Sequence, residues 1–477
     1  MAKTKRTPMS SVDTAWLRME SPVNAMMIGV VLIFEERIDI DALRRLLEER
    51  FLSFPRFRQR VVCHRDRFYW EEDPWFSLDN HLHRIALPGK ADQKALQELV
   101  SDLNSTPLYD AHPLWQIHYI DNYQGGCALM VRIHHCIADG ISLVRVLLTL
   151  TDERQAAPRK RRRRRPIDQL PEWRRVLHRT RRNLRLARRE TRLLLRNAWE
   201  DPAYLGRLAW EGAKIGSDLL QLTFSRADPP SPLKGRLSGR KIAAWSEPLD
   251  LGEVKATARA LEGTVNDVLT AAATGALHAF LRDSATPMPS EEIHVAMPFN
   301  LRPLDQPVTR LGNQFGLVLV PLPVHLTCPR MRFATVRGHL RNLKQSYQAQ
   351  VSYGLLDVLG RGPDLLEKRA LELLSRKASA VMTNVPGPTE HLHLCGARLR
   401  QPMFWVPQTG EVGIGLSIFS YAGSVQFGII SDRKLIQDPD RIAAAFADAF
   451  GELRDLALES ADTTSLRLDT QKPLSIT

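Results

Sequence analysis

The sequence predicts an α/β protein made of two domains. Its 477 residues are enough for two or three domains of ordinary size. Strand and helix patterns alternate up to about residue 150 and again after about residue 236, and an arginine-rich stretch separates the two regions. We therefore place a first domain at residues 1–152, a helical linker or insert at 153–235 and a second domain at 236–477.

In the first region, apolar runs bounded by turn residues predict strands, and apolar residues at helical spacing predict helices. The expected strands are Met26–Phe34, Leu114–Ile120 and Cys127–His134. The expected helices are Asp39–Phe51, Ala91–Leu103 and Ile141–Leu150. A Gln-Gly-Gly turn at residues 124–126 joins the last two strands into a hairpin.

The second region shows the same alternation, after a connector rich in proline, glycine and serine at Pro229–Gly239. The expected strands are Ile242–Trp245, Ile293–Met297, Gly316–Val320, Gly413–Ser420 and Ser424–Ile430. The expected helices are Val265–Leu281, Arg332–Ser352, Asp364–Lys377 and Arg441–Leu456. Mixed elements on both sides of the basic stretch indicate two α/β domains rather than one.

The positive charge of the chain is concentrated in one segment. Residues Arg154–Arg196 contain 18 Lys and Arg and three acidic residues. The net charge of this segment, +15, exceeds the net charge of the whole chain, +13. An unbroken basic run, Arg159–Arg165, is followed by apolar residues at helical spacing from Trp173 to Ala198. The pattern is typical of a helix on an anionic membrane surface, and equally of a linker helix docked by its apolar stripe. Nucleic-acid binding is less favoured, because no aromatic residues are interleaved with the charges.

The composition, 44% hydrophobic and 25% charged, excludes disordered, collagen-like and disulfide-scaffold proteins. The five scattered cysteines contain no CxxC pair, which indicates free thiols in a reducing compartment: Cys63, Cys127, Cys136, Cys328 and Cys395. The first sixteen residues contain no apolar run, so no signal peptide is predicted. The apolar stretch Ala25–Phe34 is too short for a bilayer, which needs about 20 residues. We expect a cytoplasmic protein that does not cross a membrane.

One motif carries recognisable chemistry. His134 and His135 end an apolar strand, and Asp139 and Gly140 form a turn before a helix. Neighbouring side chains on a strand point to opposite faces, so only one of the two histidines can face a given channel. An imidazole held at a strand end is suited to general-base catalysis near neutral pH, and Asp139 can brace the loop through an arginine or a backbone amide. The alternative is two core histidines and an ordinary turn, which the strand–HHxxxDG–helix context disfavours.

Other catalytic classes lack support in the sequence. Zinc sites need three or four convergent ligands, and adjacent strand histidines diverge, so we expect no metal. The HxH pairs at residues 81/83 and 391/393 are better interpreted as ordinary strand or loop histidines. A GxSxG elbow, a GxGxxG loop and a Walker A lysine motif are all missing from the sequence, which disfavours a serine hydrolase and a nucleotide-binding protein.

The HHxxxDG motif resembles that of CoA-dependent acyltransferases of the chloramphenicol acetyltransferase type and of nonribosomal peptide condensation domains. Further blocks narrow the resemblance to bacterial wax ester synthase/diacylglycerol acyltransferases, over nearly the whole chain except 154–230. These blocks are Met9–Asp13, Met27–Gly29, Pro113–Trp115, Asn266–Asp267, Pro298–Arg302, Leu311–Asn313, Asn384–Pro388, Ser420–Tyr421 and Phe427–Gly428. The chain departs from the family by Met27, where a histidine is common, and by its arginine-rich connector.

The resemblance implies two chloramphenicol-acetyltransferase-like domains with the active site in a channel between them. It implies transfer of a fatty acyl group from acyl-CoA to a diacylglycerol, a long-chain alcohol or both, in a ternary complex without a covalent acyl-enzyme. His135 would be the general base, and acyl-CoA would be a co-substrate, with no resident cofactor. Lipid substrates would keep the enzyme peripheral, through the basic segment, on the inner face of the membrane or on lipid bodies.

The resemblance also suggests roles for five further residues. His134 would point away and support the strand, and Asp139 would form a structural pair with Arg302. Asn266 would hydrogen-bond near the reacting centre or would only belong to a helix N-cap, and Ser142 would only begin its helix. The Asn384–Pro388 block is interpreted as a structural turn.

Two alternatives differ in function. One is a condensation-type enzyme that uses acyl or peptidyl carrier proteins, and the other is a non-catalytic protein that binds membranes or polyanions through its arginines.

Overall fold

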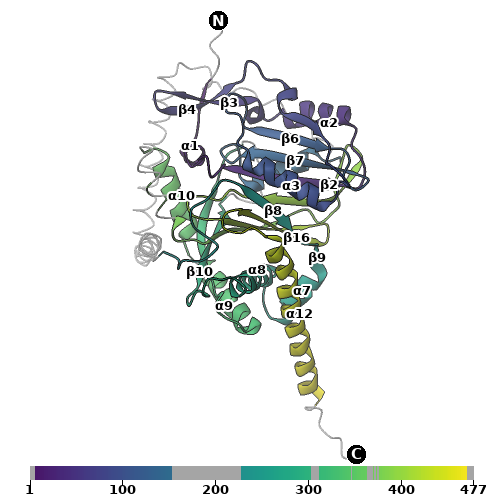
Figure 1. Cartoon of the computed structure of the whole chain (residues 1–477), viewed down its shortest axis with the longest axis vertical. Coiled ribbons are helices and arrows are strands. Elements are labelled where there is room, and N and C mark those ends of the chain that lie inside the picture. The colour runs from purple at the N-terminus through teal and green to yellow at the C-terminus, as the bar shows by residue number, and fades with distance from the viewer. Residues whose placement is uncertain are drawn as a thin grey trace, which may run out of the picture. The chain divides into compact units, whose positions relative to one another are not determined.

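The computed structural model describes residues 6–152, 227–301, 311–344, 346–362 and 375–469, with two single residues between 362 and 375. All of these residues belong to one compact unit, which comprises 1–154 and 222–477 (Figure 1). The basic run, the apolar stripe from Trp173 to Ala198, Arg302 and most of the expected helix Asp364–Lys377 lie outside the described residues.

The first large sheet has six strands and is mostly antiparallel. Its strand order is β13-β14-β2-β7-β6-β5, and only β5 and β6 are parallel. The strands are β2 (Met27–Phe34), β5 (Leu82–Ile85), β6 (Trp115–Ile120), β7 (Cys127–His134), β13 (His393–Leu394) and β14 (Ala397–Trp405). The helical segments of this half are α1 (Ser11–Arg18), α2 (Ile40–Leu46), the π-helical turn η1 (Leu47–Phe51), the 3-10 turns η2 (Pro55–Arg58) and η3 (Leu78–Asn80), α3 (Gln93–Ser105) and α4 (Gly140–Leu150). Strand β7 is central and carries the two histidines to one end of the sheet.

The second large sheet has seven strands. Its order is β11-β10-β12-β15-β16-β8, with the short β9 also paired to β16. The strands are β8 (Lys241–Trp245), β9 (Leu249–Asp250), β10 (Ile293–Asn300), β11 (Phe315–Leu322), β12 (Ala380–Pro386), β15 (Ile414–Tyr421) and β16 (Ser424–Asp432). The helices are α7 (Leu251–Ala260), α8 (Val265–Arg282), α9 (Pro329–Leu343), α10 (Gln348–Leu359) and α12 (Asp440–Asp469). Figure 1 shows α7, α8, α9 and α12 gathered on one side of this sheet.

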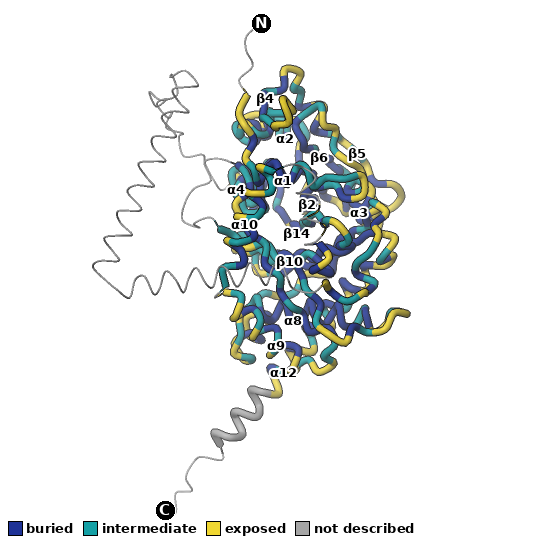
Figure 2. Tube along the Cα trace, turned by 90° about the vertical axis from the view of Figure 1, so that its left-hand side faces the viewer, coloured by how far each residue is buried: buried dark blue, intermediate teal, exposed yellow. Residues whose placement is uncertain are grey.

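The second half of the chain contributes a strand pair to the first sheet. Strands β13 and β14 come late in the sequence, but β14 pairs antiparallel with β2, so both belong to the first sheet. The domain boundaries predicted from the sequence remain a prediction, since a division of the chain near residue 236 would leave this sheet with strands from both parts. The arrangement joins the halves through backbone hydrogen bonds as well as side-chain packing, and burial is high in both sheets (Figure 2).

Most of the expected elements are confirmed, with three corrections. The single helix expected at Arg332–Ser352 is two helices, α9 and α10, which are separated at Lys344–Tyr347. Asn384–Pro386 form the end of strand β12 rather than a turn, and the strand ends before Gly387. A three-stranded antiparallel sheet of β1 (Thr7–Pro8), β4 (Arg67–Glu72) and β3 (Gln59–His64) was not predicted. Its short strands carry many charged residues, which conceals the alternating pattern.

Candidate functional site

The HHxxxDG loop connects the end of β7 to the start of α4. Asp139 is the N-cap of α4, and its Oδ1 accepts a hydrogen bond from the backbone N–H of Ser142 at 2.8 Å. Its Oδ2 accepts from the backbone N–H of Gln314 at 3.0 Å. Since Gln314 belongs to the second half of the chain, this buried carboxylate ties the motif to both halves. The expected bracing of the loop by Asp139 through backbone amides is therefore observed.

Both ring nitrogens of His134 are used in local hydrogen bonds. Its Nδ1 accepts from the backbone N–H of Cys136 at 3.1 Å, so the proton must be on Nε2. That Nε2–H donates to the carboxylate of Glu20 at 2.8 Å. The side chain is fully buried. His134 thus has no nitrogen left to accept a proton from a substrate.

In His135 the proton is on the other ring nitrogen. Its Nδ1 lies 3.0 Å from Oδ1 of Asn313. The orientation of that amide is fixed because Nδ2 donates to two acceptors, Asp13 Oδ1 at 2.9 Å and the carbonyl of His135 at 2.7 Å. An amide oxygen only accepts, so His135 carries its proton on Nδ1, and the lone pair is on Nε2. Within the described part of the chain, Nε2 has no hydrogen-bond partner.

The surroundings keep the imidazole of His135 uncharged. Trp16 stacks on it with ring centroids 4.1 Å apart and an interplanar angle of 14°, and Phe315 lies 5.4 Å away. Burial lowers the pKa of His135 to about 4. Burial likewise raises the pKa of the Cys136 thiol well above its usual value, which disfavours Cys136 as a nucleophile. The site therefore presents a neutral base rather than a thiolate.

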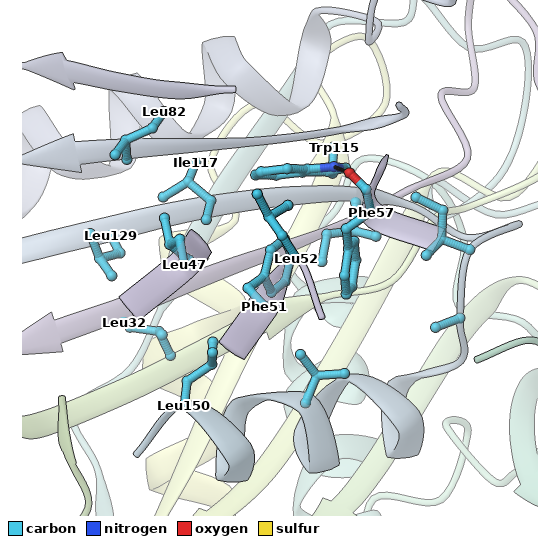
Figure 3. Close-up of a cluster of buried hydrophobic side chains, with 14 of the residues drawn as sticks. Leu32, Leu47, Phe51, Leu52, Phe57, Leu82, Trp115, Ile117, Leu129 and Leu150 are labelled. Carbon is cyan, nitrogen blue, oxygen red and sulfur yellow. Dashed lines mark hydrogen bonds between the residues drawn. The ribbon is translucent and has the colours of Figure 1, made fainter. Parts of the chain in front are cut away.

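An apolar pocket begins beside the histidines and follows α4. The residues of α4 that line it lie on one face of the helix: Gly140, Leu143, Val144, Val146, Leu147 and Leu150. The opposite wall consists of the alternating residues Ile28, Val30 and Leu32 of β2 and Leu129, Val131 and Ile133 of β7. Figure 3 shows Leu32 and Leu129 on the strands, Leu47 and Phe51 of η1 and Leu150 of α4 around one part of this region. The lining is almost entirely hydrocarbon, which suits a lipid chain.

The other predicted site residues have different surroundings. Thr264 and Asp267 form a capping box at the start of α8, as the N-cap interpretation predicts. Asn266 Oδ1 accepts a hydrogen bond from Asn384 Nδ2 at 2.8 Å, so these two sequence blocks meet. Ser142 is the third residue of α4, and its buried Oγ lacks a hydrogen-bond partner in the described structure. The pair Asp139–Arg302 stays a prediction.

The HxH histidines fill structural positions. His81 Nδ1 lies 2.8 Å from the carbonyl of Trp115, and His83 is on β5. His393 is on β13, and His391 lies beside Arg398 at the molecular surface. Among the described residues, no group of three His, Cys, Asp or Glu side chains could hold a metal ion. Nor does the described part of the chain contain a helix long and apolar enough to cross a membrane.

Sequence reasoning missed four residues that surround the histidines. Asn313 and Asp13 bind each other next to His135, Trp16 stacks on it, and Glu20 binds His134. Asp13 and Asn313 each end a sequence block that matched the acyltransferase family, but neither block by itself indicates a partner. Their proximity depends on the packing of α1 against the loop before β11, which a single sequence does not reveal.

A two-domain α/β fold with the HHxxxDG loop at the junction of its halves defines the class of acyltransferases to which the motif pointed. The family model for the wax ester synthase/diacylglycerol acyltransferase catalytic domain matches residues 9–269, and the model for the WS/DGAT C-terminal domain matches residues 311–454. The chain belongs to this family. The predicted resemblance, the fold class and the assignment as an acyltransferase are therefore confirmed.

Two curated relatives match along nearly their whole length. The probable diacylglycerol O-acyltransferase tgs1 of Mycobacterium tuberculosis (strain H37Rv) is 26% identical over 462 residues, which covers 93% of this chain and 95% of the relative. The O-acyltransferase WSD of Acinetobacter baylyi is 25% identical over 449 residues, which covers 90% and 93%. Both names describe O-acyl transfer.

Solved structures share the fold at lower identity. The wax ester synthase/diacylglycerol acyltransferase of Marinobacter aquaeolei VT8 superposes with a TM-score of 0.65 at 21% identity, covering 94% of this chain and all of that one. The starter condensation domain of rhizomide synthetase, solved with C8-CoA and Leu-SNAC, gives a TM-score of 0.56 at 13% identity, covering 95% and 94%. At these identities the likeness concerns the fold alone.

Proposed function

We propose that this acyltransferase moves a fatty acyl group from acyl-CoA to the hydroxyl of a diacylglycerol, a long-chain alcohol or both, with His135 as general base. The observation that carries the proposal is the neutral imidazole of His135, with its lone pair on Nε2, beside an apolar pocket that starts at Ile133 and Gly140. The pocket would hold the acyl chain with its thioester near the imidazole. The names of the relatives support O-acyl transfer, and the name of the family includes both wax ester synthesis and diacylglycerol acylation.

The reaction needs a base because a neutral alcohol attacks a thioester slowly. His135 Nε2 accepts the hydroxyl proton while the alcohol oxygen bonds to the thioester carbonyl carbon. The C–S bond of the resulting tetrahedral intermediate then breaks, and the imidazolium returns the proton to the departing CoA thiolate. The products are the ester and free CoA, with no covalent acyl-enzyme. General acid–base help of this kind contributes about 10²–10⁴-fold, and the ternary complex adds the benefit of proximity.

The remaining residues have supporting roles in this proposal. His134 holds the end of β7 through Glu20 and does not take part in proton transfer. Asp139 is structural, and its proposed partner is Arg302. Asn266, held by Asn384, is proposed to hydrogen-bond near the reacting centre. The match to an acyltransferase catalytic domain favours acyl-CoA over a carrier protein.

Substitution of His135 tests the proposal directly. With palmitoyl-CoA and either hexadecanol or dioleoylglycerol, His135→Ala is expected to reduce ester formation by about 10²-fold or more, because the base is lost. His118→Ala is a matched control, since His118 is also a buried histidine whose pKa burial lowers to about 4, but it lies on β6 away from the motif. Near-normal turnover by a folded His135→Ala enzyme would show that the base is another group.

We also propose that the arginine-rich segment holds the enzyme on anionic lipid surfaces. The proposal rests on the sequence alone: 18 basic and three acidic residues within Arg154–Arg196, together with the apolar stripe from Trp173 to Ala198. Co-sedimentation with anionic vesicles should weaken at high salt, and neutral vesicles should bind less. Replacing six arginines between Arg159 and Arg182 by glutamate should abolish the binding and leave turnover on a soluble acceptor unchanged. Equal, salt-independent binding to both vesicle types would make the segment a linker.

A further inference from the structure

We propose that Asn313 and Asp13 form a relay that holds the proton of His135 on Nδ1 and so fixes Nε2 as the proton-accepting atom. The inference rests on the proposed role of His135 as the base. Both residues act through another side chain and so are positioning residues. A hydrogen-bonded side chain orients the base, and a carboxylate holds that side chain in turn, as in other sites where a neighbouring group orients a general base.

In the first link of the relay, between His135 and Asn313, the donor and the acceptor are both fixed. Asn313 Oδ1 accepts from His135 Nδ1–H at 3.0 Å, while Asn313 Nδ2 donates to the carbonyl of the same histidine at 2.7 Å. The amide therefore hydrogen-bonds to both the ring and the backbone of His135. A ring rotated by 180° would place its C–H against the amide oxygen and lose the hydrogen bond. The contact thus selects one tautomer and one ring orientation.

The second link fixes the amide. Asp13 Oδ1 accepts from both the backbone N–H of Asn313 at 3.1 Å and its Nδ2 at 2.9 Å. Asp13 is the third residue of α1, 2% exposed, and Arg56 Nη2 lies 4.0 Å from its Oδ2. Arg56 is itself seated over the ring of Trp70, with Cζ 3.9 Å from the ring centroid. A buried carboxylate is costly unless it is paired and hydrogen-bonded, and here it has both kinds of partner.

The loop that carries Asn313 has a conformation that suits this role. Gly312 has a φ of +145°, a conformation that residues with a Cβ rarely adopt. The backbone conformation alone makes this demand, because a Cβ on Gly312 would lie at an ordinary van der Waals distance of 3.6 Å from Asp13 Oδ2. The glycine lets the chain turn so that the backbone N–H and the side chain of Asn313 reach the same carboxylate oxygen.

The relay crosses the junction between the two halves of the chain. Asp13 and His135 come from the first half, and Asn313 from the second. The next residue, Gln314, donates its backbone N–H to Asp139. The segment 312–314 therefore contacts the base and the end of the motif together, so that the base is oriented only when the two halves are docked.

The protonation of His135 can be measured directly by NMR of protein with ¹⁵N-labelled histidine, with the signal assigned by its loss in His135→Gln. In the unmodified enzyme we expect a proton on Nδ1 and none on Nε2. A proton on Nε2 would overturn the relay whatever the activity of the enzyme. The test is independent of the proposed function, which would fail instead if His135→Ala retained turnover.

Asn313→Ala is expected to lower kcat by about 10–100-fold, as loss of a group that orients a functional histidine does, with little change in KM for acyl-CoA. The NMR signal should show a mixture of tautomers. Asn122→Ala is the matched control, because Asn122 also bridges a backbone N–H and carbonyl, both of Leu87, and lies in the loop before β7, at the opposite end of that strand from the motif. It should lower thermal stability without changing the tautomer of His135. Loss of kcat with an unchanged tautomer would overturn the proposal.

A second test exchanges the two side chains, Asn313→Asp together with Asp13→Asn, so that an amide at 13 still faces the new carboxylate at 313. A carboxylate beside Nδ1 would favour the imidazolium, so the acid limb of kcat/KM should move to higher pH. The other ionisable groups that face His135 are Asp139, His134 and, through residue 313, Arg56, and none of these is changed. Asp13→Ala should lower kcat in the parent enzyme and much less in the Asn313→Ala background. An unmoved acid limb, or full additivity, would show that the relay does not act on the base.

Discussion

The two apolar helices α4 and α8 pack against their sheets in different ways. Helix α8 is buried at every residue from Asp267 to His278 and shares one hydrophobic cluster with the strands of the second sheet. Helix α4 is just as apolar, but Leu143, Val144 and Leu147 on its inner face are only partly buried because they line the pocket. Helix α8 completes a core, and α4 forms the wall of a cavity.

Small side chains explain the closer packing of α8. Its inner face is rich in alanine, and Gly275 approaches Ala449 of α12 so closely that a Cβ at 275 would lie 2.7 Å from the Cβ of Ala449. In contrast, a Cβ on Gly140 of α4 would meet no atom within 4 Å. The difference shows that an apolar helical stripe predicts burial without distinguishing a packed core from a lipid-sized cavity.

Truncation of a leucine in each helix should give the largest contrast. Leu277 of α8 is fully buried, so Leu277→Ala should cost about 2–5 kcal/mol of unfolding free energy through lost contacts and a new cavity. Leu147→Ala in α4 should cost about 1 kcal/mol or less, because one side of Leu147 already faces open space. Urea unfolding of both variants measures the difference. Equal costs would mean that the pocket is closed in solution.

Adding a side chain at Gly275 of α8 and at Gly140 of α4 should affect different properties, stability at the first position and activity at the second. Gly275→Ala should destabilise the protein by about 1–3 kcal/mol, since both Ala449 and the buried Arg332 lie within 3.0 Å of the new Cβ. Gly140→Val should leave thermal stability within about 0.5 kcal/mol of the parent, yet lower activity, because its side chain would enter the pocket near His135.

The measurement for the glycines pairs a thermal melt with turnover of palmitoyl-CoA. A Gly140→Val enzyme with full activity would show that the acyl chain does not pass this point. In that case the space beside Gly140 would belong to another part of the substrate or to none, and the proposed use of the pocket would be wrong.

The elements of the fold could be predicted from local patterns. Strand β7 has the predicted bounds, Cys127–His134, and most other strands and helices differ from their expected ranges by a few residues. The pairing of β14 with the first sheet could not be predicted, because the alternation of apolar residues in Ala397–Trp405 does not indicate which sheet this strand joins. Strand pairing is a tertiary property, and local sequence carries little information about it.

The same limit applies to the site. The motif identified His134, His135 and Asp139, and the difference between the two histidines follows from strand geometry. Asn313 and Glu20, which determine the tautomers of those histidines, lie 178 and 114 residues away from them in sequence. A lone asparagine or glutamate has no pattern of its own, so only the folded arrangement reveals its partner.

The far end of the pocket should set the preference for acyl chain length. From Gly140 to Leu150 the helix rises about 15 Å, so Leu150 lies at the end remote from the histidines. Leu150→Phe should shift the ratio of kcat/KM values toward shorter acyl-CoA by about tenfold, as expected for a pocket shortened by a bulky residue. Leu148→Phe is the control, because Leu148 is also partly buried on α4 but does not line the pocket. An equal shift in both variants would point to general distortion of α4.

The smallest expected effect concerns pH and again separates the two halves. Burial lowers the pKa of His81, His118 and His135 to about 4, and all three lie in the first half. Between pH 6.5 and 4 the unfolded chain binds protons at these positions and the folded chain does not, so stability should fall as the pH drops through this window. His118→Ala removes one of these histidines. Between pH 6.5 and 5.5 the variant should therefore lose less unfolding free energy than the parent, by on the order of 1 kcal/mol. Replacement of the exposed His64 provides the control, and urea unfolding at several pH values measures both. If His118→Ala left the pH dependence unchanged, His118 would be protonated in the folded protein, and the interior of the first half would be more accessible to water than its burial indicates.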